Sequence, residues 1–104
     1  MPVTEITSLA QFKEIIAKDE YSVMDFWATW CGPCRVISPV FEKMAEQFTN
    51  VKCYKVDVDT QSEISQECGI RAMPTFMAFK NGQKVKDMMG ANPPALEQLL
   101  KSLT

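Results

Sequence analysis

The spacing of apolar residues along the chain predicts four helices. Apolar positions recur at helical intervals in residues 8–16, 34–48 and 92–103, as expected for helices that bury one face. A fourth, shorter segment begins near residue 60 and ends at Gly69, a residue typical of helix C-termini. The apolar positions of the three longer segments are Leu9, Phe12, Ile15 and Ile16; Ile37, Phe41, Met44 and Phe48; and Leu96, Leu99, Leu100 and Leu103.

Short runs of apolar and aromatic residues predict the strands between these helices. Residues 3–6, 21–29 and 51–59 form three such runs, each followed by a predicted helix. Residues 75–80 and 83–89 flank Asn81-Gly82, a strong signal for a β-hairpin. This order predicts parallel strands with helical crossovers, an antiparallel hairpin in the same sheet, and helices on both faces. No linker or repeat is visible, so we expect a single domain over residues 1–104.

Polar residues and prolines refine the expected helix boundaries. Pro39 lies inside the second helical pattern and is expected to kink it, because proline lacks the amide donor and clashes with the preceding turn. Short polar residues at the other helix starts match capping patterns. The expected caps are Ser8 with Gln11, Thr60 with Glu63, and Asn92 followed by Pro93.

Composition narrows the class of protein. The chain has 104 residues, is 46% hydrophobic and has a formal net charge of −2, as in an ordinary globular domain. No basic patch suits a nucleic acid or a membrane surface, and no apolar run reaches bilayer length. The first residues resemble neither a signal nor a transit peptide, so we expect a cytoplasmic protein. A nuclear location, or a mitochondrial form after processing, fits the same sequence.

The chain contains four cysteines and no histidine. Without histidine, neither a Cys-His nucleophile pair nor a Cys₂His₂ zinc site is possible. Cys31 and Cys34 bracket Gly32 and Pro33, whereas Cys53 and Cys68 are single. We expect Cys53 to be a small core residue. Cys68 is expected to be partly exposed, either as a structural thiol or as a secondary oxidation site.

Three functions are compatible with the Cys31–Cys34 spacing: a structural crosslink, half of a metal site, or a redox-active dithiol. Thiols three residues apart at the start of a helix have Cα atoms about 5 Å apart, within the range of a disulfide. The unpaired amides and dipole at a helix N-terminus favour a thiolate at Cys31, the expected attacking sulfur. Cys34, one turn further, is expected to be more buried and to react second. A metal site is disfavoured because the other cysteines form no second pair.

Asp25 is an acid within a predicted buried strand, six residues before Cys31. Burial of a carboxylate is costly, so the pKa of Asp25 is expected to rise. A carboxyl group that is partly protonated near neutral pH can exchange a proton with Cys34. The alternative is a half-exposed acid on an edge strand.

Several motifs together resemble the thioredoxin family. These are FWATWCGPCR with the upstream Asp25, MPTF at residues 73–76, the turn KNG, and Gly90-Ala91. The resemblance extends over the whole chain and implies an α/β thioredoxin fold, a five-stranded mixed sheet flanked by four helices with the Asp25 strand at its centre. It also implies a cis Pro74 beside the dithiol. The implied substrate groove is formed by Trp30, Met73, Pro74, Gly90 and Ala91, with the Met73 backbone pairing to a client segment.

The same resemblance implies a function in protein-disulfide reduction. Cys31 attacks a client disulfide, Cys34 resolves the mixed disulfide with the help of Asp25, and Lys55 modulates Asp25 from the adjacent strand. The implied reductant is NADPH-dependent thioredoxin reductase, with no cofactor bound to the chain itself. Implied clients are peroxiredoxin, methionine sulfoxide reductase and ribonucleotide reductase.

Two rival functions remain open at this point. One is a disulfide-forming domain of an oxidising compartment, whose members usually have histidine at the position of Pro33. The other is a binding module of the same fold in which the thiols are incidental.

Overall fold

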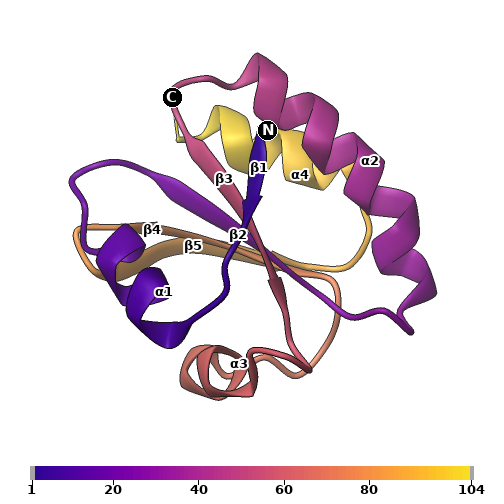
Figure 1. The fold of residues 1–104 in the computed structure, drawn as a ribbon. Coiled ribbons are helices and arrows are strands. Elements are labelled where there is room, and N and C mark those ends of the chain that lie inside the picture. Colours follow the sequence, from indigo (N-terminus) through magenta and orange to yellow (C-terminus); the bar gives the residue numbers. More distant parts are fainter. Residues whose placement is uncertain (1, 104) are drawn as a thin grey trace.

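A five-stranded mixed sheet separates two pairs of helices in the computed structural model, which describes residues 2–103 (Figure 1). The strand order is β1-β3-β2-β4-β5, which places β2 at the centre, as the resemblance implied. β1 and β2 run parallel to β3, whereas β4 is antiparallel to both β2 and β5. Along the chain the elements are β1 (Val3–Glu5), α1 (Leu9–Ile16), β2 (Ser22–Trp27), α2 (Gly32–Gln47), β3 (Lys52–Asp57), α3 (Ser62–Cys68), β4 (Thr75–Lys80), β5 (Gln83–Met89) and α4 (Pro93–Lys101).

The two sheet faces have separate apolar cores, and this explains the helical patterns in the sequence. One core contains Ile37, Phe41 and Ala45 of α2 together with the leucines of α4. The other contains Phe12 and Ile15 of α1 and Ile64 of α3. Figure 1 shows α2 and α4 on one side of the sheet and α1 and α3 on the other. Helices therefore cover both faces, as predicted.

Most of the predicted helix and turn signals are confirmed. The Ser8 hydroxyl accepts a hydrogen bond from the Gln11 amide at 3.1 Å, and the Asn92 side chain accepts one from the Ala95 amide at 3.1 Å. Gly69 ends α3 with a left-handed φ of 66°. Asn81 and Gly82 both have positive φ, at 55° and 80°, as a tight hairpin turn requires.

The capping box expected at Thr60 and Glu63 is wrong. The N-cap of α3 is Gln61, and no side chain caps it. The Asp57 carboxylate at the end of β3 instead accepts hydrogen bonds from the Asp59 amide at 2.9 Å and the Thr60 amide at 3.4 Å. Because the Thr60 hydroxyl turns back to the Asp57 carbonyl, at 3.5 Å, it does not face the helix amides.

The second helix begins earlier than its apolar pattern indicated, at Gly32 rather than near Cys34. Its N-cap is Cys31, and Pro33 occupies the first turn, where the missing amide costs no helical hydrogen bond. Pro39 lies inside the helix, and the kink expected there stays a prediction. No helix within residues 2–103 is both long enough and apolar enough to cross a lipid bilayer.

Candidate functional site

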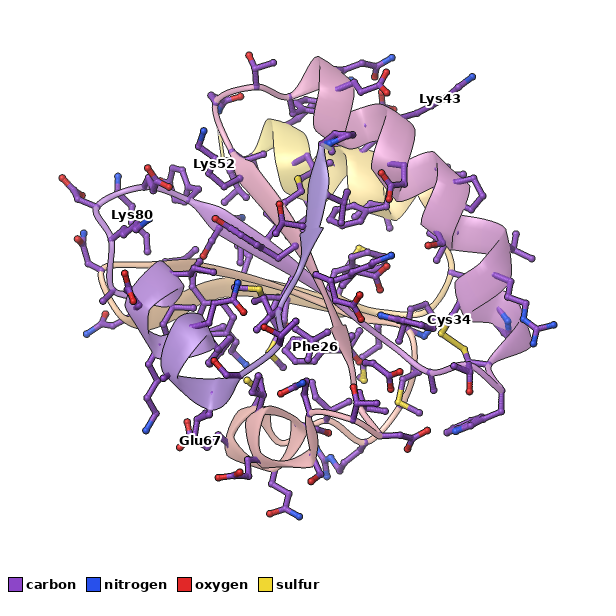
Figure 2. The ribbon with its side chains drawn as sticks, in the orientation of Figure 1. Phe26, Cys34, Lys43, Lys52, Glu67 and Lys80 are labelled. Atoms are coloured by element: carbon purple, nitrogen blue, oxygen red, sulfur yellow. A yellow bond between two sulfur atoms is a disulfide. The ribbon has the colours of Figure 1, made fainter. Side chains whose placement is uncertain are left out.

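A disulfide joins Cys31 and Cys34 where β2 passes into α2. Their Cα atoms are 5.3 Å apart, which confirms the separation expected from helical spacing. Figure 2 shows the sulfur–sulfur bond beside the label of Cys34, at the N-terminal end of α2. The pair thus lies at the carboxyl end of the central strand, where open α/β sheets place their ligand sites.

The start of α2 provides a polar contact to the first sulfur. Cys31 has an extended backbone, and its Sγ accepts a hydrogen bond from the Cys34 amide at 3.1 Å. No acidic residue lies in the first turn of α2. An amide donor and the positive end of the helix dipole both favour negative charge on Cys31 Sγ once the disulfide is opened.

Burial does not separate the two cysteines in this disulfide form. Cys31 is 4% exposed and Cys34 is 3% exposed, whereas Cys34 was predicted to be the more buried of the two. Both belong to one small apolar cluster with Ala28, and Met73 packs against it. The disulfide holds both sulfurs in this cluster. The expected difference in their reactivity therefore depends on their positions in α2, with Cys31 at the N-cap and Cys34 in the first turn.

The loop before β4 forms the neighbouring wall of the site. The Met73–Pro74 peptide bond is cis, as the resemblance implied. The Gly90 amide donates to the Pro74 carbonyl at 2.9 Å, which joins two of the predicted groove segments. Pro74 itself is buried, so Met73, which is half-buried, is the part of this loop that faces the disulfide cluster and solvent.

Trp30 provides the most exposed aromatic surface beside the disulfide. Its side chain is 65% exposed, and its indole N–H donates to Asp59 Oδ2 at 2.9 Å. Asp59 was not among the predicted site residues. Because β2 and β3 are parallel neighbours, the loops that follow them lie at one edge of the sheet, and this pairing brings Asp59 to Trp30.

Asp25 lies in the central strand and is 2% exposed, which excludes the edge-strand alternative. Burial raises its pKa to about 7, although Lys55 lowers the pKa and Glu42 raises it further. Lys55 lies directly opposite Asp25 in the parallel β2–β3 register, on the strand that the resemblance indicated. Among the described side chains, Asp25 Oδ1 has no hydrogen-bond partner.

The predicted site residues therefore fall into two groups. Met73 packs against the disulfide cluster, Trp30 precedes Cys31, and Pro74, next to Met73, is joined to Gly90 by a backbone hydrogen bond. Asp25 and Lys55 lie further along the sheet. Ala91 packs against the core on the α2 and α4 side.

A small cavity lies beside the second cysteine. It has a volume of about 120 Å³ and is lined by Trp27, Ala28, Thr29, Cys34, Arg35 and Ser38. Trp27 is the last residue of β2, two residues beyond Asp25, so the cavity reaches from Cys34 to the end of the strand that contains the buried acid.

The remaining cysteines are free thiols with little tendency to ionise. Cys53 is buried in β3, and Cys68 is half-buried at the end of α3. Burial raises the pKa of Cys53 to about 12 and that of Cys68 to about 11. Within residues 2–103, no group of three or more cysteine, aspartate or glutamate side chains is placed to hold a metal ion.

Comparison with known proteins extends over almost the whole chain. The family model described as Thioredoxin matches residues 3–102. The chain is 56% identical over 97 residues to a thioredoxin of Malassezia sympodialis, covering 91% of this chain and 92% of the relative. It is 52% identical over 101 residues to a thioredoxin of Coprinus comatus, covering 95% of each.

Solved structures agree with this match. The crystal structure of Malassezia sympodialis thioredoxin superimposes with a TM-score of 0.95 at 52% identity, covering 97% of this chain and 90% of that one. The chain therefore belongs to the thioredoxin family and is a thiol-disulfide oxidoreductase whose redox-active pair is Cys31 and Cys34.

Proposed function

We propose that Cys31 is the attacking sulfur and Cys34 the resolving sulfur of a protein-disulfide reductase. The Cys31 thiolate attacks one sulfur of a client disulfide, which forms a mixed disulfide and releases the other client sulfur as a thiolate. Cys34 then loses its proton and attacks Cys31, which closes the Cys31–Cys34 disulfide and releases the second client sulfur. The client gains two electrons, and its two thiolates take up one proton that originates from Cys34 and one from solvent. The observation that supports this order most directly is the Cys34 amide hydrogen bond to Cys31 Sγ at 3.1 Å.

The proton of Cys34 passes to Asp25 in this proposal. A carboxyl group with a pKa of about 7 is close to half ionised at neutral pH, so it can accept a proton from Cys34 and release it again. The cavity of about 120 Å³ that Cys34 and Trp27 line is large enough to hold water beside Cys34. Lys55 favours the carboxylate form of Asp25 and so promotes proton acceptance.

An extended client segment binds beside the disulfide in this proposal. The exposed ring of Trp30 and the half-buried Met73 supply apolar contacts, and the backbone of Met73 pairs with the client as an added strand. Pro74, Gly90 and Ala91 complete the groove. The hydrogen bond from the Gly90 amide to the Pro74 carbonyl supports this arrangement because it holds the two loops together.

The electrons come from NADPH through thioredoxin reductase, and the chain itself binds no cofactor. Peroxiredoxin, methionine sulfoxide reductase and ribonucleotide reductase are the proposed clients. A structural neighbour supports the first of these, because it was solved for the structural basis of the thiol resolving mechanism in yeast mitochondrial 1-Cys peroxiredoxin via glutathione/thioredoxin systems. That chain has a TM-score of 0.92 and is 40% identical, with 97% of this chain covered.

We also propose that residues 1–104 form one thioredoxin domain that works in the cytoplasm. Saccharomyces cerevisiae has a relative named Thioredoxin-1 that is 44% identical and another named Thioredoxin-3, mitochondrial, that is 42% identical. Sequence identity alone therefore does not distinguish a cytoplasmic from a mitochondrial location. Localisation of a tagged copy of the complete protein distinguishes them.

Reduction of insulin disulfides tests the proposed function. With NADPH and thioredoxin reductase, the wild-type protein is expected to consume NADPH in proportion to the insulin disulfides present. Cys34→Ser is expected to stop after the first step and to accumulate a mixed disulfide at Cys31, visible by mass spectrometry. A binding module would show no NADPH consumption in the wild type. An adduct at Cys34 in the reciprocal Cys31→Ser variant, with none at Cys31, would reverse the assigned roles.

A further inference from the structure

Alternate residues of β2 and β3 place a row of ionisable groups beneath α2. The parallel register pairs Val23 with Cys53, Asp25 with Lys55 and Trp27 with Asp57. Alternate strand residues point to the same face, and Val23 and Cys53 belong to the core that also contains the buried side of α2. Asp25 and Lys55 therefore lie on the α2 side of the sheet.

Glu42 lies at one border of the buried side of α2. Ile37, Phe41 and Ala45 are the buried residues of this part of the helix, and Glu42 follows Phe41 and is half-buried. Met44 lies on the opposite border and packs into the core shared with α4. The border that contains Glu42 therefore faces away from α4, toward the β1 edge of the sheet.

Lys55 connects this region to solvent. It lines a hollow of about 440 Å³ together with Val3, Thr4 and Glu5 of the edge strand β1. Its Nζ lies 5.9 Å from the centre of the Trp27 ring. Water in such an open hollow screens the charge of Lys55, so the attraction between Lys55 and Asp25 is weaker than in a sealed site.

The charge of Glu42 acts on both strands. It raises the pKa of Asp25 on β2 and the pKa of Cys53 on β3, whereas Lys55 lowers the pKa of Asp25. β4 faces Asp25 with the apolar Phe76, and β1 contributes Glu5, which lies opposite Lys55. The other charged group on this face of β3 is Asp57, which lies opposite Trp27. Glu42 is thus the acidic group of α2 that opposes Lys55 at Asp25.

We propose that Glu42 is a positioning residue for the proton step: from α2 it opposes Lys55 and keeps the proton on Asp25 into the neutral pH range. This inference rests on the proposed function, in which Asp25 accepts the proton of Cys34. Glu42 is not among the residues that pack against the disulfide or line the cavity beside Cys34. Its effect is on the pH range over which Asp25 is free to take the proton.

The test compares Glu42→Gln with Glu46→Gln, which removes the same charge from an exposed position of the same helix. The ¹³C chemical shift of the Asp25 carboxyl group is followed against pH in each reduced protein. In Glu42→Gln the midpoint of this Asp25 titration is expected to fall by on the order of half a pH unit, because the negative charge of Glu42 has been removed. In Glu46→Gln it is expected to match the wild type. An unchanged midpoint in Glu42→Gln, or equal shifts in the two variants, overturns the proposal.

Client reduction gives a second readout that a purely structural role of Glu42 would not produce. The acid limb of the pH–rate profile is expected to move together with the titration midpoint of Asp25. At a pH half a unit below the wild-type midpoint, Glu42→Gln is therefore expected to reduce the client about twice as fast as the wild type. An acid limb that stays in place while the midpoint moves overturns the link to catalysis. Asp25→Asn tests the proposed function separately. An undiminished rate of client reduction in Asp25→Asn would remove Asp25 from the mechanism. A titration midpoint that still shifts in Glu42→Gln would nevertheless preserve the electrostatic coupling between Asp25 and Glu42.

Discussion

Asp25 is the residue at which stability and function oppose each other most clearly. A 2% exposed carboxyl group with a pKa of about 7 is charged above that pH and remains buried. Burying a charged carboxylate destabilises the fold, and an apolar residue in the central strand would avoid this destabilisation. The proposed function gives this acid a role, because there it accepts the proton of Cys34.

The raised pKa of Asp25 predicts that wild-type stability falls as the pH rises. Between about pH 4 and pH 7 the folded form holds a proton that the unfolded form has released, so the free energy of unfolding declines across this window. The decline amounts to about 4 kcal/mol and levels off above pH 8. In Asp25→Asn this contribution is absent, and we expect the variant to be more stable than the wild type at pH 8.

Urea unfolding at pH 5 and pH 8 measures this difference. Glu46→Gln, which changes an exposed acid, serves as the control and is expected to follow the wild type at both values. Equal stability of Asp25→Asn and the wild type at pH 8 would contradict the assignment of a buried, ionised carboxyl group. Client reduction by Asp25→Asn is expected to be slower at neutral pH.

Cys68 is expected to be unreactive toward alkylating reagents in the reduced protein. Burial raises its pKa to about 11, so at pH 8 its thiolate is on the order of 100-fold scarcer than that of an ordinary cysteine. Brief treatment with iodoacetamide followed by mass spectrometry is expected to label Cys31 first and to leave Cys53 and Cys68 unmodified. Labelling of Cys68 at a rate near that of Cys31 would restore the oxidation-site alternative.

At the residue scale, the sequence predicted those groups whose chemistry is visible locally. Two cysteines three apart and an acid within an apolar strand stand out without a structure. Asp59 and Glu42 do not, because their contacts depend on how β3 and α2 pack against β2. The cis bond at Pro74 was implied only by the resemblance, since most X–Pro bonds in folded proteins are trans.

At the element scale, local capping chemistry determines where helices start. A short polar residue directly before an apolar helical pattern predicted the caps at Ser8 and Asn92 correctly. The same pattern failed at Thr60, because the Asp57 carboxylate accepts the neighbouring amides first. The start of α2 was predicted two residues late because a cysteine is an unusual N-cap.

The cap at Asn92 gives a prediction for α4. Asn92→Ala removes the acceptor of the Ala95 amide and is expected to lower the free energy of unfolding by about 1 kcal/mol. The control is Gln98→Ala, which changes an exposed amide side chain inside the same helix. Chemical denaturation of both variants measures the difference. A loss in Asn92→Ala no larger than that in the control would show that the cap does not stabilise α4.

At the scale of the whole molecule, the order of elements predicted which strands run parallel and which antiparallel, whereas the central place of β2 was implied only by the resemblance. The alternation of strands and helices required parallel pairing, and Asn81-Gly82 required the antiparallel hairpin. Within the sheet, β3 lies between β1 and β2. This arrangement joins distant parts of the sequence: it places Lys55 opposite Asp25, and the loop of Trp30 beside the loop of Asp59.

The disulfide is expected to contribute modestly to global stability. It closes a loop of only four residues, so the entropy that it removes from the unfolded chain corresponds to about 2 kcal/mol. The reduced protein should therefore unfold at a lower urea concentration than the oxidised protein, with the same fold. Unfolding curves with and without reductant measure this shift. If the reduced protein showed no cooperative unfolding, the Cys31–Cys34 disulfide would instead have a structural role.

Thiol reactivity against pH tests the central claim most directly, that the start of α2 ionises Cys31 in preference to Cys34. Alkylation rates are measured between pH 5 and pH 10 on reduced Cys34→Ser and on reduced Cys31→Ser, so that each variant retains one of the two sulfurs. We predict that Cys31 titrates below the ordinary cysteine pKa of about 8.5 and that Cys34 titrates above it. Equal midpoints near that ordinary value would contradict the account.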